Sequence, residues 1–247
     1  MPLFLSFPSR QQFQVIAHEF MEDLHFPNCI GALDGKHCKI RKPRGSGSLF
    51  YNFKNFHSIV LMACCDSKKS FIWANIGDYG SCNDASVFAE SDFGHALLNN
   101  QIQLPPSQPL PNTQIQSPYV LIGDGGFPLK DYLMKPFLRN DNITMPHRVF
   151  NYRLSHARRI VESAFGEVTE RWILTEIPLE HTEYVNSYVT ILFLLLGLFH
   201  GSGQESKKEP QKKSKVDTIF CVAEEYKRVN FEKGQLLAVF HESFLTS

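Results

Sequence analysis

The sequence lacks the simplest signatures of membrane, secreted and zinc-binding proteins. Its longest apolar run, residues 189 to 199, is far shorter than the roughly 20 residues that cross a bilayer, so we expect a buried core element and no membrane span. Six cysteines show neither a CxxC pair nor the Cys/His spacing of a zinc site, and the first residues lack the basic and apolar regions of a signal peptide. Reduced thiols inside a cell are the simplest account of these cysteines.

Net charge is also missing, because Lys and Arg together number 25 and so do Asp and Glu. The balance neither favours nor excludes a polyanionic partner. The chain is 43% hydrophobic and contains 21 Phe, which is typical of a folded globular protein, and its 247 residues suffice for one large core. We expect a helical segment over 1–28, a domain over 29–200 with a Pro/Gln-rich surface loop at 99–118, and a divergent tail over 201–247.

One carboxylate stands in the middle of an apolar, strand-like run from Cys29 to Ile40. A buried Asp needs hydrogen-bond donors, a cation or a metal, and the adjacent Gly35 allows a backbone or a ligand to come close. These features make Asp34 a candidate ligand. Asp-Gly is also the strongest short signal for a hairpin turn, so this run alone leaves a strand and a hairpin equally open.

Capping residues and hydrophobic spacing predict the other elements. Ser9 and Gln12 form a capping box for a helix that ends before Pro27. The remaining elements follow from β-branched runs, turn residues and helical spacing: two β runs at 58–65 and 71–76 joined by a turn at 66–69, a buried strand at 119–123, and a helix over 155–172.

Three carboxylates stand at the ends or edges of these elements. Asp34 lies on the first strand, Asp124 follows the strand at 119–123, and Glu162 lies on the late helix. Glu162 alone could equally form a helix ion pair with Arg158. Three carboxylates gathered in one site repel one another and require divalent cations, and Mg²⁺ suits such oxygen-only ligands.

Two segments, 35–65 and 142–161, contain no acidic residue. Both are basic and could follow the phosphates of a nucleic acid, although solvated loops remain the alternative. The basic residues are Lys36, Lys39, Arg41, Lys42, Arg44 and Lys54 in the first segment and Arg148, Arg153, Arg158 and Arg159 in the second.

Four blocks, in this order, resemble the PIF/Harbinger superfamily of DDE transposases, and among them the Harbinger transposase-derived nucleases. The resemblance covers about residues 25 to 200. The blocks are Gly31-Ala32-Leu33-Asp34-Gly35-Lys36-His37, Asn83-Asp84-Ala85-Ser86-Val87-Phe88, Ile122-Gly123-Asp124-Gly125-Gly126-Phe127-Pro128-Leu129, and Asn151 to Ser155 with Arg158 to Gly166.

The resemblance implies an α/β, RNase H-like mixed sheet with helices on both faces. It implies that Asp34, Asp124 and Glu162 are the catalytic, metal-binding triad for Mg²⁺ or Mn²⁺, with two ions expected. Asp84 is either an accessory ligand or the cap of a short helix that begins at Ala85, and we favour the cap because Asn-Asp is an ordinary capping signal. The residues expected to bind DNA phosphate are Lys36, Arg41, Lys42, Arg44, Arg153, Arg158 and Arg159.

The function implied is a metal-dependent DNA endonuclease that hydrolyses phosphodiester bonds, and the alternative is a catalytically silent nuclear scaffold for a DNA-binding partner. The family also implies a separate Myb/SANT-like partner and a nuclear location, with cytoplasm as well. Two departures, a short N-terminal helix before the Asp34 block and an ending changed after His200, favour the alternative or a truncated gene model. Family members typically lack a DNA-reading domain of their own, and no helix-turn-helix or zinc-finger pattern in this sequence contradicts that. The Lys-rich run at 207–215 is expected to be a linker or a nuclear-targeting signal.

Overall fold

The computed structural model describes residues 7–138 and 143–172. The chain separates into two units, Met1–Gly201 and Ser202–Ser247, and all elements below belong to the first. The predicted tail over 201–247, its Lys-rich run and the apolar run at 189–199 lie outside the described residues. The predicted domain boundaries therefore stay a prediction.

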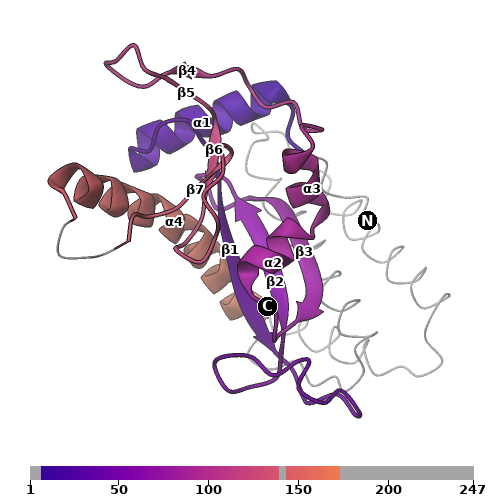
Figure 1. Cartoon of the computed structure of the whole chain (residues 1–247). Coiled ribbons are helices and arrows are strands. Elements are labelled where there is room, and N and C mark those ends of the chain that lie inside the picture. Colours follow the sequence, from indigo (N-terminus) through magenta and orange to yellow (C-terminus); the bar gives the residue numbers. More distant parts are fainter. Residues whose placement is uncertain (1–6, 139–142, 173–247) are drawn as a thin grey trace, which may run out of the picture. The chain divides into compact units, whose positions relative to one another are not determined.

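A five-stranded mixed sheet, in the order β3-β2-β1-β6-β7, forms the centre of the unit (Figure 1). The first three strands are antiparallel neighbours, whereas β6 runs parallel to β1 and β7 runs parallel to β6. This arrangement confirms the expected α/β, RNase H-like fold. The strands are β1 (Cys29–Lys39), β2 (Ser58–Cys65), β3 (Phe71–Tyr79), β6 (Val120–Ile122) and β7 (Leu133–Met134).

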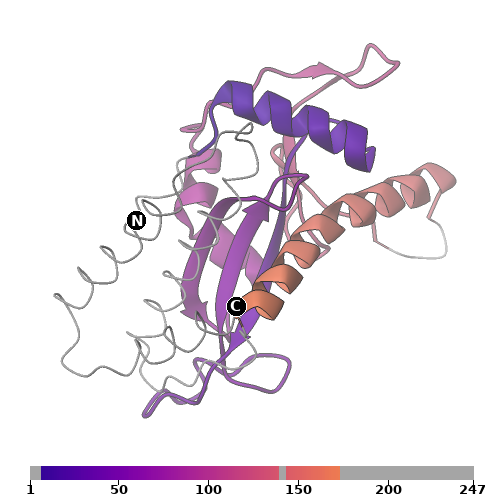
Figure 2. The same cartoon turned by 180° about the vertical axis from the view of Figure 1, so that it is seen from behind.

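Helices cover both faces of this sheet, as the fold class requires. Along the chain they are α1 (Arg10–Leu24), α2 (Asp84–Ala89), α3 (Asp92–Leu98) and α4 (Met145–Trp172). Figure 2 shows α1 and α4 in front of the sheet, and Figure 1 shows α2 and α3 on the opposite side. Every residue of β2 is buried because the strand is covered on both faces.

The strand β1 runs straight through Asp34 and Gly35. Asp34 pairs with Ala63 and Gly35 pairs with Met62 in one continuous antiparallel register with β2. The hairpin alternative at Asp-Gly is therefore wrong. A turn there would have interrupted a strand whose first five residues are fully buried and whose ladder continues to Lys39.

The helix α1 forms where the capping box predicted it. Ser9 Oγ accepts a hydrogen bond from the Gln12 backbone N–H at 3.3 Å, and Gln12 Oε1 accepts one from the Ser9 backbone N–H at 2.7 Å. One face buries Phe13, Ile16, Ala17 and Phe20. The helix ends at Leu24 because His25 adopts a left-handed conformation, with φ at 54°.

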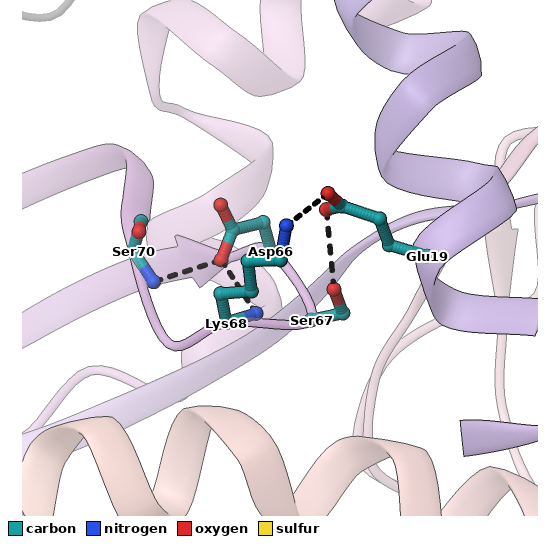
Figure 3. A network of polar contacts seen from close by, with 5 residues as sticks. All are labelled: Glu19, Asp66, Ser67, Lys68 and Ser70. Atoms are coloured by element: carbon teal, nitrogen blue, oxygen red, sulfur yellow. Dashed lines mark hydrogen bonds and ion pairs between the residues drawn. The ribbon is translucent and has the colours of Figure 1, made fainter. Parts of the chain in front are cut away.

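The turn between β2 and β3 ties the sheet to α1 (Figure 3). Asp66 Oδ1 accepts hydrogen bonds from the backbone N–H groups of Lys68 and Ser70 at 2.9 and 2.8 Å, which closes the turn. The Lys68 ammonium and the Ser67 hydroxyl both contact the Glu19 carboxylate on α1. This network anchors the end of the β2–β3 hairpin that the sequence predicted.

The helix α4 begins at Met145, well before the predicted start near Ser155. The Thr144 carbonyl accepts a hydrogen bond from the Arg148 backbone N–H at 3.0 Å, and Pro146 occupies the first turn, where its missing N–H costs nothing. The buried stripe of the helix comprises Leu154, Ala157, Val161, Ala164, Phe165 and Val168. The apolar stripe starts late, so it did not reveal the first turns.

Smaller elements differ from the predictions as well. The strand β3 continues to Tyr79 rather than ending at Ile76, and α3 and β7 were not predicted. The loop at 99–118 is irregular except for one short antiparallel pair, β4 (Gln108–Pro109) with β5 (Gln116–Ser117). Among the described helices, none has both the length and the apolar character to cross a membrane.

Candidate functional site

The candidate site lies where β1 continues beyond the end of its parallel neighbour. β6 pairs with β1 only from Cys29 to Ala32 and ends at Ile122, and no other described strand pairs with the rest of β1 on that side, which we call the free edge of β1. Asp124 follows β6 after one glycine, and Asp34 is the second β1 residue past the pairing. Ligands commonly bind at the carboxyl ends of parallel strands, which is the position of these two carboxylates.

Asp34 points toward the face of the sheet that α4 covers. Arg158 lies opposite it, with Nη1 3.5 Å from Asp34 Oδ1. The same guanidinium contacts Glu162, since Arg158 Nη2 lies 2.6 Å from Glu162 Oε1 one helical turn on. Arg158 therefore joins the first and third carboxylates of the predicted triad.

Burial and repulsion act together on the Asp34 carboxyl. Only 16% of its side chain is exposed, and this burial, opposed by Arg158 and assisted by Asp84, Asp124 and Glu162, raises its pKa to about 6. The charges of the three other carboxylates are therefore close enough to Asp34 to raise its pKa. A cation at this edge would relieve the repulsion among them.

Asp84 approaches β1 from the opposite face. Successive strand residues face opposite sides of a sheet, so Gly35 faces away from α4. An added Cβ at Gly35 would lie 2.2 Å from Asp84 Oδ1, so the glycine leaves room for this carboxylate. Burial, and then the charge of Asp124, raise the pKa of Asp84, while Lys54 opposes the rise.

The interpretation of Asp84 as the cap of α2 is wrong. Asn83 is the cap, because its side chain accepts a hydrogen bond from the Ser86 backbone N–H at 2.9 Å, and Asp84 is the first helical residue. Both residue types are good caps, so the sequence could not choose between them. The outcome leaves the Asp84 carboxylate available to the site.

Asp124 sits in a tight turn beside an unexpected cation. Its Oδ1 accepts a hydrogen bond from the Gly126 backbone N–H at 2.8 Å. The Lys135 ammonium, which follows β7, donates to the Gly125 carbonyl oxygen at 3.2 Å. Sequence reasoning missed Lys135, although a lysine at the carboxyl end of the neighbouring parallel strand is a usable signal.

The structure separates the predicted phosphate-binding residues into groups. Lys36 lies on the α4 side, with its ammonium 5.9 Å from the centre of the Phe165 ring. Arg158 forms ion pairs with two carboxylates. The other predicted residues are exposed: Arg41, Lys42, Arg44, Arg153 and Arg159. From the sequence, Lys54 was named only as part of the first basic segment. In the structure, its charge acts to lower the pKa of Asp84.

The carboxylates are close neighbours but not a finished metal-binding cluster. Among residues 7–138 and 143–172, no group of three or more His, Cys, Asp and Glu side chains is arranged as it stands to hold a metal ion. Arg158 bridges two of the acidic side chains that such a group would need. Small side-chain rotations would therefore have to accompany binding of a cation.

Comparison with curated proteins finds several relatives, some of which are named as nucleases. The chain is 29% identical over 175 residues to "Protein ALP1-like" of Arabidopsis thaliana, a match that covers 68% of this chain and 41% of that protein. It is 25% identical over 169 residues to "Putative nuclease HARBI1" of Xenopus laevis and 23% identical over 172 residues to the Homo sapiens protein of that name. Those matches cover 68% of this chain and 43% and 44% of the relatives.

The chain thus spans less than half the length of these curated relatives. No solved structure matches it. The resemblance to Harbinger transposase-derived nucleases is confirmed by these relatives. A family model described as DDE superfamily endonuclease matches residues 33–196, a range that holds Asp34, Asp84, Asp124 and Glu162, and the chain belongs to that family.

Proposed function

We propose that this protein is a metal-dependent DNA endonuclease whose catalytic carboxylates are Asp34, Asp124 and Glu162. One observation carries the proposal. The buried Asp34 carboxyl lies within electrostatic reach of three other carboxylates at a free strand edge. A structural ion pair alone would not require four acidic side chains at one place.

The chemistry of these side chains suits a hard divalent cation. All the candidate ligands are carboxylate oxygens, which Mg²⁺ and Mn²⁺ prefer, and their mutual repulsion favours a cation. Asp34, Asp124 and Glu162 would hold it, with Asp84 as an accessory ligand from the other face. Two such ions would supply Lewis acidity at the phosphodiester and a more acidic bound water.

The chain's own cations would orient the DNA. A guanidinium that spans two carboxylates can also bind a phosphate through two parallel hydrogen bonds, so Arg158 is suited to hold the backbone beside the carboxylates. Lys54 would add positive charge near Asp84, and Lys135 would add it at the turn that follows Asp124. Exposed arginines and lysines of the two acid-free segments would extend this surface.

The family resemblance adds two further proposals. Target choice would depend on a separate Myb/SANT-like DNA-binding protein, because phosphate contacts carry no sequence information. The protein would act in the nucleus and also occur in the cytoplasm. A scaffold without catalysis becomes the better account if the cleavage experiment below fails.

Removing the Asp34 charge should stabilise the protein at neutral pH. Since the folded-state pKa of Asp34 is raised to about 6, its charged form opposes folding, and this cost appears as pH rises from about 4 to about 6. In a chelating buffer, Asp34→Asn should gain about 1 to 3 kcal/mol in unfolding free energy at pH 7.5 and nothing at pH 4. Urea unfolding of wild type and Asp34→Asn at pH 7.5 and at pH 4 measures the difference in unfolding free energy. An equal difference at the two pH values would contradict the repulsion.

Loss of one carboxylate should abolish cation binding. Asp124→Asn should remove Mn²⁺ binding in calorimetry and all Mg²⁺- or Mn²⁺-dependent plasmid nicking, while circular dichroism stays as in wild type. Asp23→Asn, an exposed change on α1, serves as the matched control and should keep both properties. Undiminished Mn²⁺ affinity in Asp124→Asn would overturn the assignment of the ligands, and a chelator-insensitive nicking activity would overturn the metal dependence.

The basic loop after β1 should set the salt dependence of DNA binding. If Arg41, Lys42 and Arg44 each contact a phosphate, replacing all three by Ala should reduce the slope of log affinity against log salt by up to about 3. Arg10→Ala on α1 should leave the slope unchanged. Fluorescence anisotropy with one duplex at several salt concentrations measures the slope, and a triple variant with the wild-type slope would assign the loop to solvation alone.

A further inference from the structure

Phe53 presents an aromatic ring to solvent in the loop between β1 and β2. It is 79% exposed, the highest value for an aromatic side chain in the described residues. Single exposed apolar side chains are common on proteins and need no special explanation. Phe53 differs from such a residue in how its backbone is held and in which side chains surround it.

The backbone on both sides of Phe53 is fixed by a buried asparagine. Asn52 is only 3% exposed, and its Oδ1 accepts hydrogen bonds from the backbone N–H groups of Lys54 and Phe56 at 2.9 and 3.2 Å. Its Nδ2 donates to Ser58 Oγ at 2.8 Å, at the start of β2. The tip of this loop is therefore held on the sheet, and the Phe53 ring is displayed from a rigid base.

Phe53 is also joined to the strand that carries the candidate site. His37 Nδ1 lies 2.9 Å from Ser58 Oγ, and the His37 ring meets the Phe53 ring edge to face at 5.4 Å between centroids. His37 is two residues beyond Gly35 and faces the same side, so the strand position that contacts the Phe53 ring lies about 7 Å along β1 from Gly35, where Asp84 approaches.

Positive charge accompanies the ring. The Lys54 ammonium lies 5.4 Å from the centre of the Phe53 ring, and its charge reaches both His37 and Asp84. No acidic residue occurs between Gly35 and Cys65. The ammonium lies over the ring, and an aromatic ring with a cation close by suits a nucleobase and its phosphate, because every base offers a π-face for stacking.

We propose that Phe53 is a stacking platform for a nucleobase displaced from the duplex next to the phosphodiester that is cut. This inference rests on the proposed endonuclease function and names its substrate class. Bases inside a duplex have their faces covered by their neighbours, so only an unpaired or displaced base can reach the ring. The preferred substrate is therefore DNA with unpaired nucleotides beside the cleavage position.

The test uses DNA binding by the whole 247-residue chain in a chelating buffer, where no cleavage is expected. Anisotropy compares a blunt duplex with the same duplex carrying a short unpaired run, and wild type should bind the second about tenfold more tightly. Phe53→Leu keeps a large apolar side chain and removes the π-face, so it should lose this preference with unchanged affinity for the blunt duplex. Phe53→Trp should retain it, and both variants should melt as wild type because the side chain is exposed.

A fluorescent base gives an independent readout of stacking. With 2-aminopurine in the unpaired run, wild type and Phe53→Trp should quench its emission, and Phe53→Leu should not. An unchanged preference or unchanged quenching in Phe53→Leu would overturn the proposal. So would a change in sedimentation that accompanies the loss of binding, since Phe53 would then be a protein contact.

The two proposals fail separately. If the preference for unpaired DNA follows Phe53 but no metal-dependent nicking is found, the stacking platform stands and the endonuclease proposal falls. If nicking requires Asp124 while Phe53→Leu binds and stacks as wild type, the endonuclease stands and the platform falls.

Discussion

Repulsion among carboxylates at the free edge of β1 is the constraint on which the site depends. Only 16% of the Asp34 side chain is exposed, it follows five buried residues of β1, and Asp84, Asp124 and Glu162 add to the cost of its charge. Arg158 offsets part of that cost by contacting two of the four. Under the proposed function, a divalent cation bound at this edge would relieve the remaining repulsion.

The fold brings the acidic groups together from both faces of the sheet. β1 extends beyond the end of β6 and so has its free edge. The helix α4 carries Arg158 and Glu162 on one face of the sheet, and α2 carries Asp84 on the other. Gly35 makes the second approach possible because any side chain there would displace the Asp84 carboxylate. The loop that holds Phe53 and Lys54 starts at the end of the same strand, so a DNA strand along this edge would meet carboxylates, ammonium groups and an aromatic ring in turn.

Local patterns predicted the elements but not what they bring together. The capping box of α1, the apolar run of β1 and the two β runs after it follow from neighbouring residues, and the structure has them. The start of α4 and the role of Asp84 were misjudged because the first turns lack an apolar stripe and two capping residues stand side by side. Lys54 lies near Asp84, Lys135 near the Gly125 carbonyl and Phe53 against His37 through contacts between segments apart in the sequence, which periodicity does not encode.

The most direct test of the account is anomalous scattering from a crystal of this protein grown with Mn²⁺. The account predicts manganese peaks bound by the carboxylates of Asp34, Asp124 and Glu162, with the Arg158 guanidinium moved off Asp34. Crystals of Asp124→Asn grown in the same solution provide the control and should lack these peaks. The account would be contradicted if fully occupied manganese sites were found only elsewhere on the surface. In that result Arg158 would remain paired with both Asp34 and Glu162.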